Sequence, residues 1–175
     1  SRMSRQRTGK RIKFTGRDLE ILKLLDRYRF LRSTHLHALA GGKSQKRFVE
    51  RLGDLYHEGG YIDRPRQQWQ AINARYMPAV YELGDAGRKM LAEYGATPES
   101  VTARAGRHGR HPSRHYHHEL MICDILASIE IGVRADPNLR FIAWPEILAS
   151  PKMPKATRNA ARPMAANVSV AYSAP

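Results

Sequence analysis

Basic and polar side chains crowd the start of a short amphipathic segment, residues 44–58. Arginine and lysine bind guanine or phosphate strongly, glutamine pairs with adenine, and a serine at a helix start can donate to phosphate. If the segment is a helix with its charged side chains outward, it can read double-stranded DNA. The alternative is an ordinary solvated helix face. The candidate contacts are Ser44, Gln45, Lys46, Arg47 and Arg51.

A second group of candidate contacts belongs to a predicted hairpin over residues 61–83, with strands at 61–64 and 79–83 and a long polar tip. A hairpin that follows a recognition helix commonly contacts the minor groove or the nearby backbone, where arginine is favoured if the groove is narrow. The candidate contacts here are Arg64, Arg66, Gln68 and Arg75.

Residues 1–13 contain basic side chains and no acid, which predicts a flexible arm that binds DNA. The alternative is a disordered tail without a role. The net charge of +14 arises from three such basic segments, and unopposed basic arms suit contact with a polyanion. The candidate contacts in the arm are Arg5, Arg7, Lys10 and Arg11.

The elements around these residues follow a known order. Thr15 and Asp18 predict a capped helix over residues 15–28, Ser33 or Thr34 begins a second helix, and Gly41-Gly42 ends it. Residues 44–58 form the third helix, with Phe48, Val49, Leu52, Leu55 and Tyr56 on its buried side. The hairpin and a fourth helix over residues 85–94 follow, which is the layout of a winged helix-turn-helix.

The second part of the chain predicts a partial α/β segment. A helix over residues 113–133 is apolar on nearly every face, so it must be covered on more than one side. One or two strands follow, at 139–144 and at 167–172. The fold class is therefore mainly α with a small β-hairpin wing. We expect an arm at 1–14, a winged helix-turn-helix domain at 15–95, a basic linker at 96–113 and a partial α/β or dimerisation segment, which looks truncated, at 114–175.

Histidines are the main pointer to an enzyme. His115 shares a helical face with His118 and Glu119, at spacings that metal ligands use, and Cys123 follows. However, the zinc-protease pattern His-Glu-x-x-His, a phosphate-binding glycine loop and a serine nucleophile motif do not occur. We expect no catalytic residue, no metal and no cofactor. The cluster comprises His108, His111, His115, His117 and His118.

Asp124 lies in the apolar part of the same helix, and a buried carboxylate needs a partner. We expect Arg134, Arg140 or a histidine to supply it. The single cysteine excludes an internal disulfide, and the sequence has no membrane-spanning run and no secretory signal. These features indicate a cytoplasmic protein.

Three stretches carry a family resemblance: Arg17-Asp18-Leu19-Glu20-Ile21-Leu22 with Phe30-Leu31 and His35-Leu36, then Arg51-Leu52-x-x-Leu55-x-x-x-Gly59, then Tyr81-Glu82-Leu83-Gly84-x-x-Gly87. Over residues 15–145 the chain resembles the replication-relaxation family of plasmids, phages and integrative elements, which is related to mobilisation accessory proteins. The resemblance implies an N-terminal winged helix-turn-helix and a second α/β part that begins at His117-His118-Glu119-Leu120.

In the family, the second part continues with acidic strands that resemble a nuclease superfamily. This chain has no acid after Glu146, so the resemblance implies no nuclease centre here. The sequence therefore predicts a sequence-specific DNA-binding protein of a mobile element, acting as a transcriptional regulator or as a replication or mobilisation accessory factor. We expect a homodimer with a relaxosome or replication protein as a further partner and no membrane association. The alternative is a metal-assisted nuclease or relaxase-associated enzyme that uses the histidine cluster.

Overall fold

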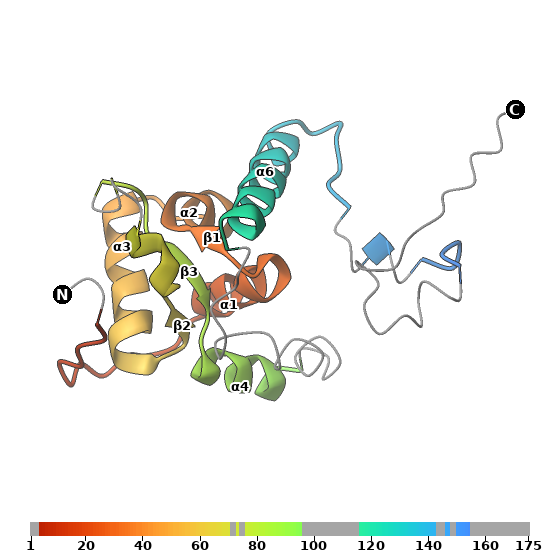
Figure 1. Cartoon of the computed structure of the whole chain (residues 1–175). Helices are drawn as coiled ribbons and strands as arrows, with labels where there is room; N and C mark the ends of the chain where they lie inside the picture. The colour runs from red at the N-terminus through yellow and green to blue at the C-terminus, as the bar shows by residue number, and fades with distance from the viewer. Residues whose placement is uncertain are drawn as a thin grey trace, which may run out of the picture. The chain divides into compact units, whose positions relative to one another are not determined.

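The computed structural model describes residues 4–70, 73, 76–95, 116–142, 146–147 and 150–154. The described residues are mainly helical, with one small antiparallel sheet of three strands. Residues 1–132 form one compact unit and residues 133–175 form another. The first unit contains the helices and strands that position the candidate DNA contacts (Figure 1).

Helix α1, Gly16–Tyr28, begins with the predicted capping box. The Thr15 side chain accepts from the Asp18 backbone N–H, and the Asp18 carboxylate accepts from the Thr15 backbone N–H at 2.7 Å. These two bonds satisfy amide groups that a helix start leaves without partners. Strand β1, Leu31–Arg32, follows and leads directly into helix α2, Ser33–Ala40.

Helix α3, Gln45–Asp54, covers the first part of the predicted third helix. A π-helical turn, Leu55–Gly59, completes it, and the turn ends at Gly60, which adopts a left-handed backbone (φ 62°). Glycine adopts this conformation without steric cost, so Gly60 can end the helix here. Helix α3 therefore begins at the α2–α3 turn, and the π-helical turn after it leads to the sheet.

The sheet has the strand order β1-β3-β2. Strand β2, Ile62–Asp63, and strand β3, Val80–Leu83, are antiparallel, as the predicted hairpin requires, with Ile62 opposite Leu83. A short 3₁₀ helix, Arg66–Gln70, lies between them. Strand β1 pairs with the other edge of β3, which ties the hairpin to the segment between α1 and α2.

Helix α4, Asp85–Glu93, starts directly after β3 and packs close to the beginning of β2. A Cβ atom at Gly87 would overlap the carbonyl oxygen of Tyr61. Only glycine allows the two backbones to approach so closely. This contact accounts for Gly87 in the third stretch that carries the family resemblance.

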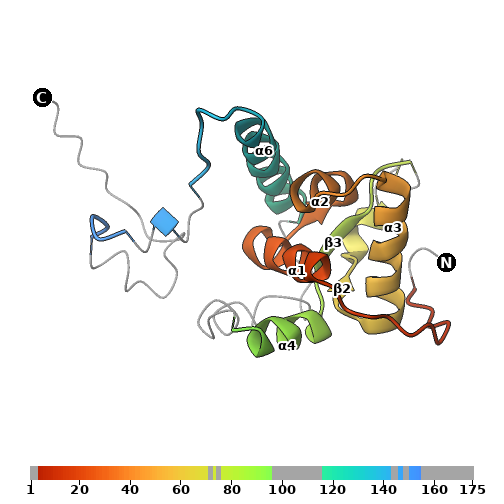
Figure 2. The same cartoon turned by 180° about the vertical axis from the view of Figure 1, so that it is seen from behind.

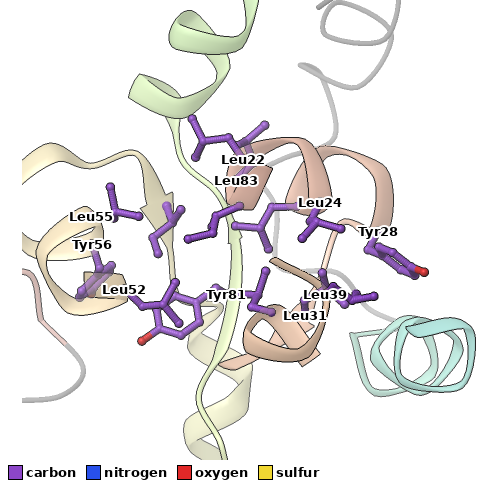
Figure 3. Packing of buried hydrophobic residues seen from close by; sticks show 14 of the residues in the cluster. Leu22, Leu24, Tyr28, Leu31, Leu39, Leu52, Leu55, Tyr56, Tyr81 and Leu83 are labelled. Carbon is purple, nitrogen blue, oxygen red and sulfur yellow. The ribbon is translucent and has the colours of Figure 1, made fainter. Parts of the chain in front are cut away.

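One core holds the three N-terminal helices on the sheet. Leu22 of α1, Leu52 of α3 and Leu83 of β3 all point into it, and each is at most 2% exposed (Figure 3). Burial of apolar area is the main stabilising contribution in a domain of this size. The core fixes the direction of α3 relative to α1 and α2.

Helix α6, Tyr116–Arg134, is the predicted long helix. Only one stripe of this helix is buried among the described residues, and large apolar side chains remain exposed on the other side. The strand predicted at 139–144 is also not found over 139–142, because a strand needs a neighbour to pair with. Residues 143–145 and the strand predicted at 167–172 lie outside the described residues.

The N-terminal arm is bound to the fold rather than free over its described part. The backbone and hydroxyl of Thr8 donate to Glu58 at 2.8 and 2.7 Å, and the backbone of Gln6 donates to a ring nitrogen of His57 at 3.1 Å. The arm therefore follows the π-helical turn after α3. Composition predicted a flexible arm because the composition of a segment does not show which acceptors far along the chain will bind it.

Candidate nucleic-acid interface

The turn between α2 and α3 is held in a fixed shape. Gly41 and Gly42 both have positive φ, 75° and 145°, which allows the sharp change of direction. A ring nitrogen of His37 hydrogen-bonds the carbonyl of Gly42 at 2.9 Å, and the same ring packs 5.1 Å from the Phe48 ring. The start of α3 is therefore anchored to α2 through His37.

The first turn of α3 presents polar and basic side chains to solvent. Ser44 caps the helix by accepting from the Arg47 backbone N–H, while Gln45, Lys46 and Arg47 are exposed. The first turn contains no acidic residue. Because the backbone amides at a helix start also attract anions, this end of α3 is electropositive.

Two further cations belong to the same surface, and sequence reasoning missed both. Lys43 is exposed in the turn before Ser44. Arg17, at the start of α1, places a guanidinium nitrogen 3.7 Å from the position that a Cβ of Gly42 would occupy. Only the packing of α1 against α2 brings Arg17 here, although a search for exposed cations at helix starts could have included it. We call Arg17, Lys43, Lys46 and Arg47 the α3 basic surface.

Val49 was predicted to be buried, and this prediction is wrong, because 41% of the residue is exposed. It follows Gln45 by one helical turn and lies beside the exposed Glu50. Val49 thus adds an apolar group to the outer side of α3. A methyl group of thymine is the base feature that such a side chain can contact, and a glutamate can accept from cytosine.

Arg51, which was predicted as a DNA contact, is held by acceptors within the chain. Its Nε donates to Asp18 at 2.9 Å, and its Nη2 donates to Asp18 at 2.6 Å and to the Lys13 carbonyl at 2.7 Å. The physical reason is the burial of Asp18, which is only 1% exposed and needs a positive partner. Arg51 ties α3 to the start of α1.

The ionisation of Asp18 reflects the same contacts. Burial disfavours its charged form, but hydrogen bonds from Arg51 and Thr15 outweigh burial and place the pKa of Asp18 below the ordinary value. The Asp18 hydrogen bond correspondingly raises the pKa of Arg51. The pair is therefore charged at neutral pH, and the Arg51 guanidinium is directed at Asp18.

Two of the four predicted hairpin contacts have structural roles. The Arg64 guanidinium lies 4.3 Å from the Tyr56 ring centre and 5.1 Å from that of Tyr81, whose hydroxyl accepts from it. The Gln68 side chain bonds both the N–H and the carbonyl of Val80, at 2.9 and 3.0 Å. Intramolecular partners therefore occupy both side chains.

The remaining two hairpin candidates have different outcomes. Arg66, at the start of the 3₁₀ helix, is exposed. Arg75 lies outside the described residues. Among the described residues of the hairpin, Arg66 is therefore an exposed arginine that can reach a ligand.

The predicted contacts of the arm divide in the same way. Arg5 donates to the carbonyl of Tyr56 at 2.7 Å, and the Lys10 ammonium is 2.6 Å from Asp54. Arg7 and Arg11 are exposed. Intramolecular partners thus occupy Arg5 and Lys10, whereas Arg7 and Arg11 extend outward from the bound arm.

The histidine cluster does not form a metal site within the described residues, where no three potential ligands lie together. Glu119 binds Arg29 at 2.8 Å, and the Cys123 thiol is buried and donates to the Tyr28 carbonyl. Burial raises the pKa of the Cys123 thiol, which disfavours the thiolate that binds metals. The remaining members, His108, His111 and His115, lie outside the described residues.

Asp124 pairs with residues that the sequence did not indicate, apart from the expected histidine. Arg32 of β1 donates to both carboxylate oxygens, at 3.1 and 2.9 Å, and a ring nitrogen of His35 lies 3.4 Å from one of them. Arg140 instead contacts Glu146. Asp124 therefore anchors α6 to β1 and α2.

The model of the family described as replication-relaxation matches residues 22–163. The chain belongs to the replication-relaxation family. Membership indicates a role in the replication or mobilisation of a plasmid or other mobile element. No curated protein and no solved structure gives a significant match.

The family match agrees with the resemblance read from the sequence. It covers the chain from the middle of α1 through α6. Within the part of the chain that the structure describes, no helix is long and apolar enough to cross a membrane.

Proposed function

We propose that this replication-relaxation protein binds double-stranded DNA in a sequence-specific manner. The outer side of α3 enters the major groove, and the protein acts as a transcriptional regulator or as a replication or mobilisation accessory factor of a mobile element. The proposal involves binding alone and no catalytic step. The observation that supports the proposal most directly is the exposure of Lys46 and Arg47 on the electropositive first turn of α3.

The arrangement of elements supports a winged helix-turn-helix. The chain order is α1, β1, α2, α3, β2, β3 and α4, and the hairpin of β2 and β3 is completed by β1 in one sheet. In this architecture the third helix is the recognition helix and the hairpin is the wing. Helix α3 lies at the edge of the unit in both views, with α1 and α2 on one side of it (Figure 1 and Figure 2).

The contacts are proposed to divide by chemistry. The proposed readers of base edges are Gln45, Lys46, Arg47 and Val49, which are exposed on α3. Amide, cationic and methyl groups match different bases. Arg17 and Lys43 lie beside the helix start and bind phosphate, which positions the protein without reading sequence. Arg66 of the wing and Arg7 and Arg11 of the arm extend the phosphate contacts.

A binding titration tests this assignment. Fluorescence anisotropy with a duplex selected from a random DNA pool compares the wild type with the double variant Lys46→Ala/Arg47→Ala. We expect affinity to fall by at least about 30-fold, since two base contacts of about 1–3 kcal/mol each contribute at least about 2 kcal/mol together. The matched control is Lys89→Ala, which removes an exposed lysine from α4. Equal affinity of the double variant and the control would contradict the proposed interface.

The selection step separately tests sequence specificity. A recurring sequence among the bound fragments supports base reading by α3, and retained binding without any recurring sequence contradicts it. No binding to any duplex at low salt, where phosphate contacts are strongest, would contradict the DNA-binding proposal itself.

A further inference from the structure

The tip of the hairpin between β2 and β3 carries two large side chains that the fold leaves uncovered. Tyr76 is 89% exposed, and the adjacent Met77 is 49% exposed. Single exposed apolar side chains are common, whereas exposed ones that lie together often mark a binding surface. The contacts proposed so far give neither residue a role.

Hydrogen bonds within the hairpin hold these two residues in place. The Asn73 carbonyl accepts from the backbone N–H groups of Tyr76 and Met77, at 3.0 and 3.2 Å. Below the tip, the Gln68 side chain bonds both the N–H and the carbonyl of Val80, which joins the two sides of the hairpin. Tyr76 and Met77 are therefore presented from a fixed base, and a surface that is already in place loses less entropy when it binds.

The charge around the tip indicates what kind of partner it fits. Residues 64–81 contain three arginines and no acidic residue, and Arg66 is exposed. Positive charge beside an apolar tip suits a partner that combines negative charge with flat apolar surfaces. Nucleic acid has both, because its phosphates flank bases whose faces stack on aromatic rings. The net charge of +14 disfavours a second copy of this chain at the tip.

The tip lies at the end of the fold that the proposed interface uses. The segment that leads into β3 lies at the same end of the first unit as the start of α3 in both views (Figure 1 and Figure 2). With α3 in the major groove, a hairpin at this end can reach the adjacent minor groove. Apolar side chains that enter a minor groove can insert between neighbouring base pairs.

We propose that Tyr76 and Met77 form an apolar wedge that enters the minor groove beside the α3 site and partly unstacks one base step. The inference rests on the proposed function, because α3 places the wedge on the duplex. Insertion of this kind bends DNA, and bending costs least at flexible pyrimidine–purine steps. The wedge therefore adds a preference for a TA or CA step at a position that α3 does not contact.

Bending and affinity, measured on one duplex, test the wedge. Energy transfer between dyes at the two ends of the duplex selected from a random pool measures bending, and anisotropy measures affinity. We expect the wild type to raise the transfer on binding, and Tyr76→Ala to lose most of this rise and bind at least about fivefold more weakly, as for loss of one stacked base. Tyr76→Phe keeps the ring and should behave as the wild type. The matched control is Tyr94→Ala, since Tyr94 is also exposed and lies outside the hairpin.

A change in the DNA gives a second test. Replacing the flexible step beside the α3 site by a stiff A-tract should weaken binding of the wild type, because the wedge must then unstack a step that resists bending. The same replacement should affect Tyr76→Ala less, since this variant has lost the ring that is inserted. Equal losses in the two proteins overturn the wedge.

The outcomes separate the wedge from the α3 interface. A wild type that binds the duplex without bending it, or a Tyr76→Ala variant that binds and bends it as the wild type does, overturns the wedge and leaves the α3 interface standing. A wild type that binds no duplex overturns the proposed function and the wedge with it. Binding to phosphatidylserine vesicles that Tyr76→Ala loses, with unchanged affinity for the duplex, assigns the tip to a lipid surface and overturns the wedge alone.

Discussion

The guanidinium of Arg51 closes on the buried carboxylate of Asp18, with N···O distances of 2.9 and 2.6 Å. This contact joins the middle of α3 to the first turn of α1 across 33 residues of sequence. It removes Arg51 from the proposed DNA contacts and makes it a structural residue. Its side chain is 25% exposed, whereas that of Asp18 is 1% exposed.

Arg51→Ala should therefore reduce stability strongly. The substitution leaves Asp18 buried without its positive partner, and loss of one member of a buried pair costs about 3–5 kcal/mol. Urea unfolding of the variant measures the loss. The control is Lys23→Ala, which breaks the exposed pair with Glu20 and should cost under about 1 kcal/mol. Similar losses in the two variants would show that the Asp18 pair has no special role.

Glu82 should make stability decrease as the pH rises. It lies opposite Asp63 across β2 and β3, and burial together with the Asp63 charge raises the pKa of Glu82 to about 7 from an ordinary 4.5. Between these two values the folded chain keeps a proton that the unfolded chain has lost, so stability decreases through this window as pH rises.

The expected loss between pH 5 and pH 8 is roughly 2 kcal/mol, because one pKa unit corresponds to about 1.4 kcal/mol and Glu82 is only partly buried. Glu82→Gln should flatten this dependence, which urea unfolding at the two pH values can measure. Glu93→Gln, at an exposed position of α4, should leave the dependence unchanged. A slope that survives in Glu82→Gln would rule out this carboxyl as its source.

Glu130 should hold α6 on the first unit. It is 2% exposed and accepts from both Arg27 and Tyr28. Glu130→Ala leaves the Tyr28 hydroxyl and Arg27 without this acceptor, so hydrogen exchange should accelerate over 116–134 by at least about tenfold, with less change in α1. Glu119→Ala removes a pair that is about 30% exposed and should have a smaller effect. Equal effects of the two substitutions would contradict the anchoring role.

Salt dependence should separate cations that bind phosphate from cations that have intramolecular partners. Lys43→Ala, in the α3 basic surface, should lower the slope of log Kd against log salt concentration by about one unit, because it removes one released counterion. Lys10→Ala should change the slope less, since Asp54 already neutralises Lys10. Titrations at four salt concentrations give both slopes. If Lys10→Ala lowered the slope more than Lys43→Ala, the arm and not the turn before α3 would be the segment that contacts the DNA backbone.

Local pattern was sufficient for much of the fold. The capping box of α1, the glycine-rich α2–α3 turn and the start of α3 at Ser44 are all set by contacts within a few residues. The strand predicted at 139–144 is not found over 139–142, because local pattern does not determine a strand. A strand depends on a pairing partner that lies elsewhere in the chain, and composition alone does not reveal whether that partner is present.

The candidate site was predicted less completely. Exposure of Lys46 and Arg47 follows from the helical period alone, since the apolar positions of α3 fix which side faces outward. Arg51, Arg64 and Gln68 share the residue types of DNA contacts, but Asp18, Tyr81 and Val80 bind them. Arg17 was missed because its approach to Gly42 depends on packing between two helices.

The amino-acid sequence by itself determined the family, the excess of positive charge and the helices that carry it, because these depend on residue type and short-range spacing. Only the tertiary structure decided which cations remain available and which side of α6 is exposed. The physical reason is that a buried carboxylate such as Asp18 or Glu130 takes whichever cation the fold brings to it, and that choice depends on distances between residues far apart in the chain.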